Sequence, residues 1–434
     1  MGSVVPLFPG EHSGKAAGQP RVVAALDVGS VQMACLIGEV HKGRARKAAG
    51  LRIIGHAVRV SRGVKAGVIV DPAAAERAIR LVVDAAERMA GVQVREAWVN
   101  LSGGNPRTTT LAADMNVGGK AVRQEHMGML AARALAAFDA GARLVVQVTP
   151  ARFSLDDGPW ISDPTGLLAD RLAARVNVVS MDRGPLRNLE QTLRACQLDI
   201  AGLKCAPAAA GEAALTDDER ELGVLLVDIG AAQTGWAAFH EGVLLEAGMT
   251  PVGGHHITCD IAAGLHTPIA EAERLKTVYG SVLPGAGHEE EVLSIPVLGD
   301  NGPGGWQGVS RARLQGIIVP RMEELLEMLR EATAHLPDEV RKRVVLTGGG
   351  AQLAGVADMA EKLLKARVRV GNVRTIAGLP PKLAGPTHAT VAGLLQAALR
   401  PDAQGLELAL QAEQVLQAAS GYLGRVKRWF RESF

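Results

Sequence analysis

Val22-Val23-Ala24-Ala25-Leu26-Asp27-Val28-Gly29-Ser30 is the stretch that decides which fold this chain is expected to adopt. In it a hydrophobic strand runs into a turn that holds an aspartate and a glycine. A second such stretch, Val224-Leu225-Leu226-Val227-Asp228-Ile229-Gly230, follows 201 residues later (228 − 27), and a third strand, Val344-Val345-Leu346, runs into Thr347-Gly348-Gly349-Gly350. Glycine lets backbone N–H groups approach phosphate oxygens because it has no Cβ. The three turns together predict one nucleotide-binding site.

The two aspartates of these turns also have a simpler explanation. Such turns occur in many hairpins, where the carboxylate only caps local backbone. The duplication of Asp27 and Asp228 in matching strand contexts, followed by the triple glycine, favours a role beside Mg²⁺, usually through water. The helix expected after the triple glycine would also offer its N-terminus to an anion or to an adenosine group.

The composition is typical of a globular protein long enough for two or more cores. The chain has 434 residues, of which 47% are hydrophobic and 21% charged, with a net charge of +2. That charge gives no sign of a nucleic-acid partner. The four cysteines have no C-x-x-C spacing, which argues against a metal or disulfide framework and is typical of a reducing cytoplasm. We expect residues 1–20 to be a disordered tail and find no run of 18 apolar residues.

The order of the expected elements alternates between strands and helices, which predicts two α/β lobes. The spacing of apolar residues predicts a helix over 72–89. A separate unit is expected to begin near Val92, with its first strand at 97–101. The strand expected at 175–180 would return to the main body, and the Gly- and Pro-rich stretch 284–309 is expected to be mostly loop.

Four passages of the chain resemble the actin-like ATPases and, among them, the FtsA family of bacterial cell-division proteins. They are residues 251–262 (PVGGHHITCDIA), 272–276 (AERLK), 346–356 (LTGGGAQLAGV) and 421–434 (GYLGRVKRWFRESF). The first resembles the hinge into the second lobe, the second the helix on the adenosine, the third the adenosine loop, and the fourth a membrane-targeting tail.

The resemblance implies a two-lobed actin-like ATPase fold with an FtsA-type subdomain inserted in the first lobe and an amphipathic helix at the C-terminus. It implies a first lobe made of residues 21–91, 166–205 and 373–400, with the insertion at 92–165. The second lobe would have a nucleotide part at 206–250 and 316–372 and an outer part at 251–315. A linker at 401–420 would then lead to the helix at 421–434.

The resemblance also implies ATP and Mg²⁺ as cofactors. Asp27 and Asp228 would face the metal. Glu273 and Lys276 share one helical face, and the alternative for them is a surface ion pair of little energy. The residues expected to contact the nucleotide are Asp27, Gly29, Ser30, Asp228, Gly230, Thr234, Gly254, Glu273, Lys276, Gly348, Gly349 and Gly350.

The chain departs from the family pattern at the phosphates. Gln32 stands where the first turn usually has a lysine. The second turn usually reads Asp, apolar, three glycines, two threonines and Asp, but here it is Asp228-Ile229-Gly230-Ala231-Ala232-Gln233-Thr234-Gly235. At the first inter-lobe crossing, which we place at 149–153, Ala151 replaces a water-orienting glutamine. Phosphoryl transfer depends on positioning and charge neutralisation, so we expect weak or no hydrolysis.

The last 14 residues are predicted to form a helix that lies on the membrane. The apolar side chains fall on one side of that helix, and the basic ones flank or oppose it. At roughly 21 Å the helix is too short to cross a hydrocarbon core of about 30 Å. The alternative is a helix docked on its own protein. The residues expected at the membrane are Tyr422, Leu423, Arg425, Val426, Lys427, Arg428, Trp429, Phe430 and Arg431.

The function that the resemblance implies is an adaptor of cell division at the cytoplasmic face of the inner membrane. It would bind FtsZ, polymerise head to tail, contact later division proteins through the insertion, and bind anionic lipid but no nucleic acid. An actin-like scaffold of another envelope machine, of pilus or secretion type, is the first alternative. A metabolic kinase is the second, and it lacks a candidate catalytic base.

Overall fold

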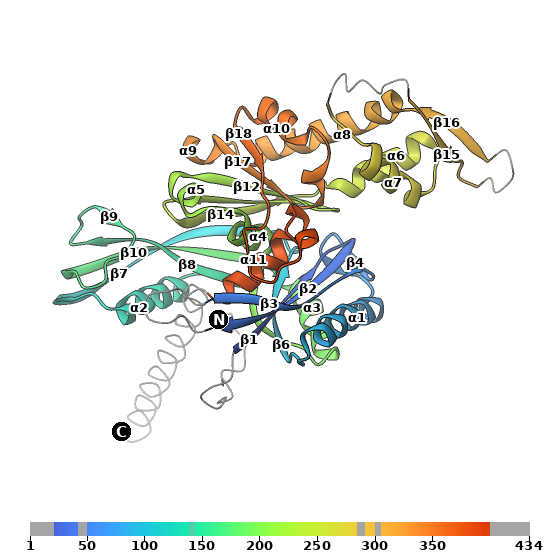
Figure 1. Cartoon of the computed structure of the whole chain (residues 1–434). Helices are drawn as coiled ribbons and strands as arrows, with labels where there is room; N and C mark the ends of the chain where they lie inside the picture. The colour runs from blue at the N-terminus through green and yellow to red at the C-terminus, as the bar shows by residue number, and fades with distance from the viewer. Residues whose placement is uncertain are drawn as a thin grey trace, which may run out of the picture.

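The computed structural model describes residues 21–41, 50–139, 141, 143–283, 291–299 and 305–399. The predicted tail, linker and membrane helix therefore lie outside the described residues. Figure 1 shows two α/β lobes, with a third sheet beside them that carries strands β7, β8 and β10. No helix of the described part is long and apolar enough to cross a membrane.

The first lobe is built on a five-stranded mixed sheet with β1 at its centre. Helix α1 covers this sheet, and its buried face holds Ile79, Val82, Val83 and Ala86, as the apolar spacing predicted. Asp71 caps the helix by accepting from the Ala74 N–H at 3.0 Å. The elements are β11 (Asp199–Cys205), β6 (Glu96–Leu101), β1 (Arg21–Val28), β2 (Gln32–His41) and β3 (Gly50–Val60) in sheet order, with α1 (Pro72–Ala90), α3 (Arg183–Ala195) and the small hairpin β4 (Val64–Lys65) and β5 (Val68–Ile69).

The inserted unit has its own four-stranded antiparallel sheet and its own apolar core. Its long central strand β10 pairs with β7 on one side and with β8 on the other. The prediction that strand 175–180 returns to the main body is therefore wrong, and strand 97–101 belongs to the first-lobe sheet as β6. Sequence spacing gave no information on these pairings. The elements are β7 (Arg107–Ala121), β10 (Leu168–Asp182), β8 (Arg143–Leu155), β9 (Trp160–Ile161) and helix α2 (Gln124–Ala136).

The second lobe carries a five-stranded sheet with β12 at its centre and an outer helical part. The stretch 284–309, predicted to be mostly loop, contains a two-stranded hairpin whose Leu293, Ile295 and Val309 side chains are buried. The sheet order is β14 (Val243–Thr250), β13 (Thr234–His240), β12 (Val224–Ile229), β17 (Arg343–Thr347) and β18 (Arg367–Val370). The other elements are α5 (Asp217–Leu222), α6 (Gly254–Leu265), α7 (Ile269–Tyr279), β15 (Val292–Pro296), β16 (Trp306–Ser310), α8 (Arg311–Ala332), α9 (Asp338–Arg341) and α10 (Val356–Leu364).

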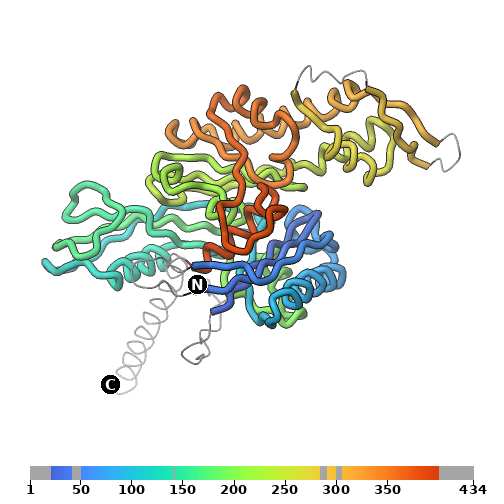
Figure 2. Tube along the Cα trace, viewed as in Figure 1, coloured from blue at the N-terminus to red at the C-terminus, as the bar shows by residue number. Residues whose placement is uncertain are grey.

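Two short helices join the lobes. Helix α4 (Ala206–Ala214) follows β11 of the first sheet and leads to the second sheet, while α11 (Ala389–Ala397) follows the last second-lobe strand and packs on α4 and β1. Figure 2 shows this C-terminal segment between the two lobes. The first inter-lobe crossing is thus at α4, and its placement at 149–153 was wrong, because Ala151 is a buried residue of β8 in the inserted sheet.

The insertion is also bonded to the second lobe, at edge strand β14. The Asn177 Nδ2 donates to the Leu244 carbonyl at 2.8 Å, and its Oδ1 accepts from the Thr110 hydroxyl at 2.8 Å. The Ala247 N–H donates to the Thr108 hydroxyl at 3.1 Å. These side chains satisfy backbone groups that a sheet edge would otherwise leave open.

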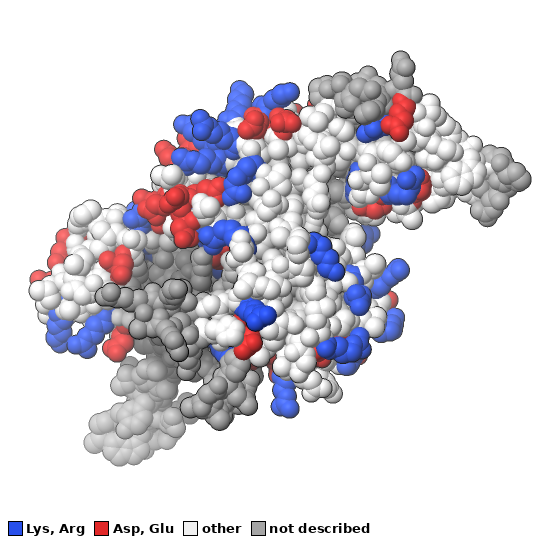
Figure 3. All heavy atoms as spheres, in the orientation of Figure 1, with Lys and Arg blue, Asp and Glu red and all other residues white. Residues whose placement is uncertain are grey.

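Surface charge is unevenly spread over the lobes. On the face shown in Figure 3, Lys and Arg gather over the α9–α10 end of the second lobe and beside α1. The surface between the two lobes carries few charged side chains in the same view.

A substitution at the α4–α11 contact tests this joint. A Cβ on Gly393 would lie 1.7 Å from the Ala209 carbonyl oxygen, so Gly393→Ala must push the helices apart. We expect a loss of about 1–3 kcal/mol or more in the free energy of unfolding. The matched control is Gly316→Ala in α8, where a Cβ meets open space and a gain of about 0.5–1 kcal/mol is expected. Urea denaturation of both variants measures this, and equal effects would contradict the packing.

Candidate functional site

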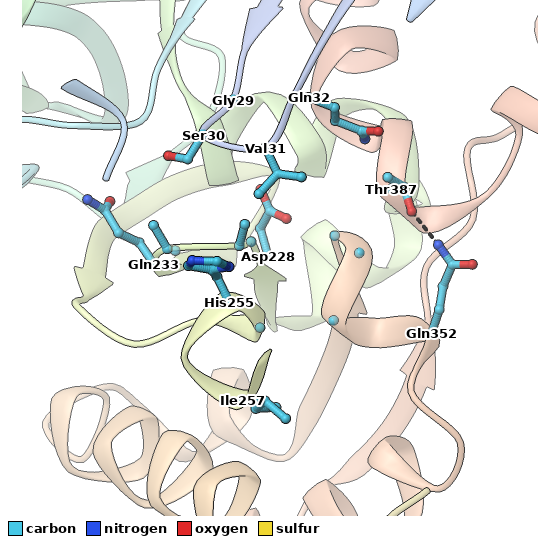
Figure 4. A pocket seen from close by; sticks show the side chains of 18 of the residues that line it. Gly29, Ser30, Val31, Gln32, Asp228, Gln233, His255, Ile257, Gln352 and Thr387 are labelled. Atoms are coloured by element: carbon cyan, nitrogen blue, oxygen red, sulfur yellow. Dashed lines mark hydrogen bonds between the residues drawn. The ribbon is translucent and has the colours of Figure 1, made fainter. Parts of the chain in front are cut away.

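One cavity of about 590 Å³ lies where the two lobes and the triple-glycine turn meet. Its volume is in the range of small-molecule sites. Figure 4 shows the first turn, from Gly29 to Gln32, above Asp228, with Gln352 and Thr387 at the opposite end from Gln233. Of the residues predicted to contact a nucleotide, the cavity wall contains all but one: Asp27, Gly29, Ser30, Asp228, Gly230, Gly254, Glu273, Lys276, Gly348, Gly349 and Gly350.

The exception is Thr234. This residue is fully buried in β13, and its hydroxyl donates to the Val252 carbonyl at 2.8 Å. The hydroxyl therefore holds the backbone at the start of the stretch 251–262 and does not line the cavity.

Two aspartates from different lobes occupy the floor of the cavity. Burial raises the pKa of Asp27 to about 7, and the charge of Asp228 adds to this, while a 2.7 Å hydrogen bond from the Asn100 amide lowers it. Burial also raises the pKa of Asp228 to about 6, and the hydrogen bond from the Thr390 hydroxyl, at 3.2 Å, lowers it. The environment of both carboxylates thus disfavours their charged form, and a nearby cation would stabilise that form.

Asn100 is a cavity residue that the sequence analysis missed. Its Nδ2 reaches both Asp27 and the Ser102 hydroxyl at 2.7 Å, and its Oδ1 accepts from the Val28 N–H at 2.8 Å. With 2% of its surface exposed, it is the polar end of a buried strand. An asparagine near the end of the apolar run 97–101 was the available signal.

The triple glycine forms one wall through close packing. Gly348 has φ 83°, and a Cβ there would lie 2.4 Å from Asp228 Oδ1. A Cβ on Gly350 would lie 2.3 Å from Ile229 Cγ2. A Cβ on Gly349 would meet nothing within 4 Å. The outer two glycines are therefore required by the packing on β12, while the middle one faces open space in the cavity wall.

The opposite wall is a hydrogen-bonded cluster between α6 and α7. The Lys276 ammonium donates to Glu273 Oε2 at 2.7 Å, to the Thr258 hydroxyl at 2.8 Å and to the Gly254 carbonyl at 2.9 Å. Burial raises the pKa of Glu273, but the hydrogen bonds from Lys276 and Thr258 outweigh burial and leave that pKa lowered. The pair is therefore part of a partly buried network that joins two helices, and not an isolated surface ion pair.

The wall at the inter-lobe crossing is apolar. Ala206 and Pro207 line the cavity there, and the Pro207 ring lies 3.1 Å from where a Cβ of Gly235 would be. The residue after this proline is Ala208. At the crossing as the structure places it, the residue after the proline is thus again an alanine and not the glutamine of the family pattern. The proline ring fills the space beside Gly235.

The cavity wall carries more negative than positive charge. Among the described residues that line it, Lys276 is the sole lysine or arginine, set against Asp27, Asp228 and Glu273. The described part of the chain also holds no cluster of three or more His, Cys, Asp or Glu side chains that could bind a metal by themselves. A metal here would need ligands from a bound molecule or water besides the two aspartates.

Comparison with known protein families finds matches for two stretches of the chain. Residues 225–393 match the family described as "Cell division protein FtsA". Residues 103–180 match the "SHS2 domain inserted in FTSA", which covers the four-stranded sheet of the insertion.

Comparison with solved structures shows the fold. The chain is similar to a PilM–PilN type IV pilus biogenesis complex, with a TM-score of 0.60 and 17% identity over 87% of this chain and 99% of that one. It is similar to MreB5 of Spiroplasma citri bound to ADP, with a TM-score of 0.53 and 11% identity over 89% and 98%. The predicted two-lobed actin-like fold with an inserted subdomain is confirmed.

Comparison with curated proteins shows the family. The chain is 37% identical over 426 residues to the cell division protein FtsA of Agrobacterium fabrum, covering 95% of each chain. It is 28% identical over 428 residues to that of Escherichia coli K12, covering 95% of this chain and 98% of the relative. The chain therefore belongs to the FtsA family of actin-like cell-division proteins.

Proposed function

We propose that this division protein binds ATP with Mg²⁺ between its lobes, hydrolyses it weakly or not at all, and holds FtsZ filaments to the inner membrane. The observation that carries the nucleotide part is the convergence of residues from three distant turns on one cavity. The adaptor part rests on the family and on the sequence of residues 421–434.

The residues present fit the proposed cofactors. The partly buried carboxylates of Asp27 and Asp228 would face a hydrated Mg²⁺, which would supply positive charge to the phosphates. The Glu273–Lys276 network and the Gly348–Gly350 turn would hold the adenosine side. A triphosphate would need the metal, because the cavity wall itself has a net negative charge.

Weak hydrolysis follows from what surrounds the phosphate end. Ala231 and Ala232 carry Cβ atoms where the family pattern has glycines, and Gly235 lacks the trailing carboxylate. The crossing offers Ala206 and Pro207 to the cavity, neither of which has a polar side chain to orient water. Binding needs none of these groups, whereas turnover needs a positioned nucleophile.

The adaptor role needs surfaces more than chemistry. We propose that the second lobe binds FtsZ, that the inserted subdomain contacts later division proteins, and that copies associate head to tail into a filament. The pilus-type alternative has a similar solved structure, but at 17% identity that likeness concerns the fold alone. The FtsA relatives match at up to 37% identity over nearly the whole chain.

A substitution at Gly349 tests nucleotide binding. Gly349→Trp puts a large side chain into the cavity without a backbone clash, so calorimetry should show loss of ATP binding while the fold is retained. Gly184→Trp in α3, another glycine with open space around it, should bind ATP like the unchanged protein. Phosphate release by the unchanged protein should stay far below about 1 s⁻¹; a rate near that value would contradict the proposal.

The aspartate pair predicts a pH dependence. A cation must displace the proton from Asp27, whose pKa is about 7, so Mg·ATP affinity should rise roughly tenfold from pH 6 to pH 8. Because the folded-state pKa is raised, the free protein's own stability should instead fall as pH rises from about 4 to about 7. Asp27→Asn should weaken both trends and leave the part of the stability trend that comes from Asp228, whose pKa is raised to about 6, while Asp358→Asn on the surface of α10 should change neither. Calorimetry at pH 6 and pH 8 measures the affinity, and urea denaturation at about pH 4 and about pH 7 measures the stability.

The membrane helix is tested by liposome co-sedimentation with FtsZ. Deleting 421–434, or changing Trp429 and Phe430 to Glu, should release the protein and FtsZ from anionic liposomes, since each buried aromatic offers about 1.5–3 kcal/mol and each basic residue about 1. Trp306→Glu, which changes an exposed tryptophan of β16, is the control and should stay bound. A filament carries many such helices, and together they bind the membrane firmly although each one binds weakly. The protein should therefore be bound to lipid mainly as filaments, which electron microscopy should show. Unchanged pelleting of both tail variants would rule out the helix.

A further inference from the structure

The loop after β12 reaches across the cleft to the first lobe. Gln233 Nε2 donates to the Ala66 carbonyl oxygen at 2.6 Å. Next to Ala66, the Gly67 N–H donates to the Ser30 hydroxyl at 3.0 Å. Hydrogen bonds therefore link the turn after β1, which holds Ser30, through the tip of the β4–β5 hairpin to the turn after β12, which holds Gln233.

The acceptor of this bond is held rigidly. Ala66 and Gly67 have φ of 48° and 70°, the left-handed pair that a tight two-residue hairpin requires. A Cβ on Gly67 would lie 2.5 Å from the Gly103 nitrogen, so the hairpin tip is packed against the backbone that follows β6. The Ala66 carbonyl is therefore a fixed point of the first lobe and not the end of a loose loop.

Gln233 occupies a position where the family pattern has a threonine, the first of the two that follow three glycines. A threonine hydroxyl ends one bond beyond Cβ, while the glutamine amide ends two bonds further out. The longer side chain is what spans the distance to Ala66. Figure 4 shows it beside His255, below Ser30, at the end of the cavity away from Gln352.

The orientation of the amide is set by its partner. Because the Ala66 carbonyl accepts only, the NH₂ group of Gln233 must face it. Gln233 Oε1 then points the other way, buried, and accepts from no group among the described residues. An unpaired acceptor of this kind repels a phosphate oxygen and suits a donor such as a ribose hydroxyl or a water. Gln233 therefore offers the cavity an acceptor, whereas a threonine at this position would offer a hydroxyl donor to a phosphate.

We propose that Gln233 is an interlobe clasp, a positioning residue that holds the two lobes closed around the cavity before any ligand enters. In this chain the closed state is stabilised by a side chain of the second lobe bonded to the backbone of the first. A ligand then gains less from closing the cleft, because a ligand shifts a conformational equilibrium only by its differential affinity for the two states.

The clasp is tested by the distance between the lobes in ligand-free protein. Spin labels on Arg77→Cys in α1 and Lys362→Cys in α10, both exposed, report that distance in a background where Cys196 and Cys259 are serine. The unchanged clasp should give one narrow distribution. Gln233→Glu, which keeps the length but turns the donor into a carboxylate that the Ala66 carbonyl repels, should shift it to longer distances and broaden it. Gln233→Thr should do the same.

The matched control is another glutamine of the same cavity. Gln352 donates to the Thr387 hydroxyl, but the Gly348 N–H to Pro386 carbonyl bond, at 3.0 Å, ties the same two segments. Gln352→Ala should therefore leave the distribution unchanged. Labels within one lobe, at Lys362 and Glu323, should give the same distance in every variant, which shows that the lobe is folded.

Two results would overturn the clasp. One is an interlobe distribution that is the same with and without the Gln233 amide. The other is an equal shift in Gln352→Ala, which would mean that any lost cavity contact loosens the cleft. All of these measurements are made without nucleotide. They therefore test the clasp even if the protein proves not to bind ATP.

Discussion

The parallel pairing of β12 with β17 is the constraint on which the cavity depends. In its register Asp228 lies opposite Thr347, so the second aspartate turn and the triple glycine leave the same edge of one sheet side by side. Gly348 must then be glycine, because any Cβ would occupy the space of the Asp228 carboxylate. The turn after β1, with Asp27 and Gly29, forms the other side of the cavity. The packing of α4 on α11 holds the two lobes together at this point.

That arrangement places two carboxylates in a partly buried cavity, where Lys276 on the opposite wall is the sole lysine or arginine among the described lining residues. Protons offset part of the negative charge of the cavity wall in the free protein, since the pKa of Asp27 is raised to about 7. Side chains such as Asn100 and Thr390 reduce this cost by hydrogen bonding but do not remove it. A cation such as the Mg²⁺ that we propose would stabilise the two carboxylates, and the apolar crossing at Pro207 has no polar side chain to orient a water.

Much of this could be predicted from the sequence, because strand-turn motifs with aspartate and glycine are local and the family pattern is specific. The helix at 72–89 and the convergence of the three turns followed directly. Strand pairing did not: the 175–180 strand was assigned to the wrong sheet, and the crossing was placed at Ala151, because a Thr-Pro-Ala sequence in a sheet and the true Ala-Pro-Ala crossing look alike without their partners. Asn100 and Gln233 act over 73 and 167 positions of sequence, a separation that no local pattern reports.

The bonds between the insertion and β14 attach that subdomain to both lobes. Its chain enters from and returns to the first lobe, yet Asn177 and Thr108 attach it to the edge of the second. A change in the angle between the lobes would either break these bonds or swing the whole sheet with the second lobe. In the second case the insertion acts as a lever arm: its far end, at β9, would sweep a larger arc than the cleft itself. A partner gripping that end would then sense the state of the cavity mechanically, without touching it.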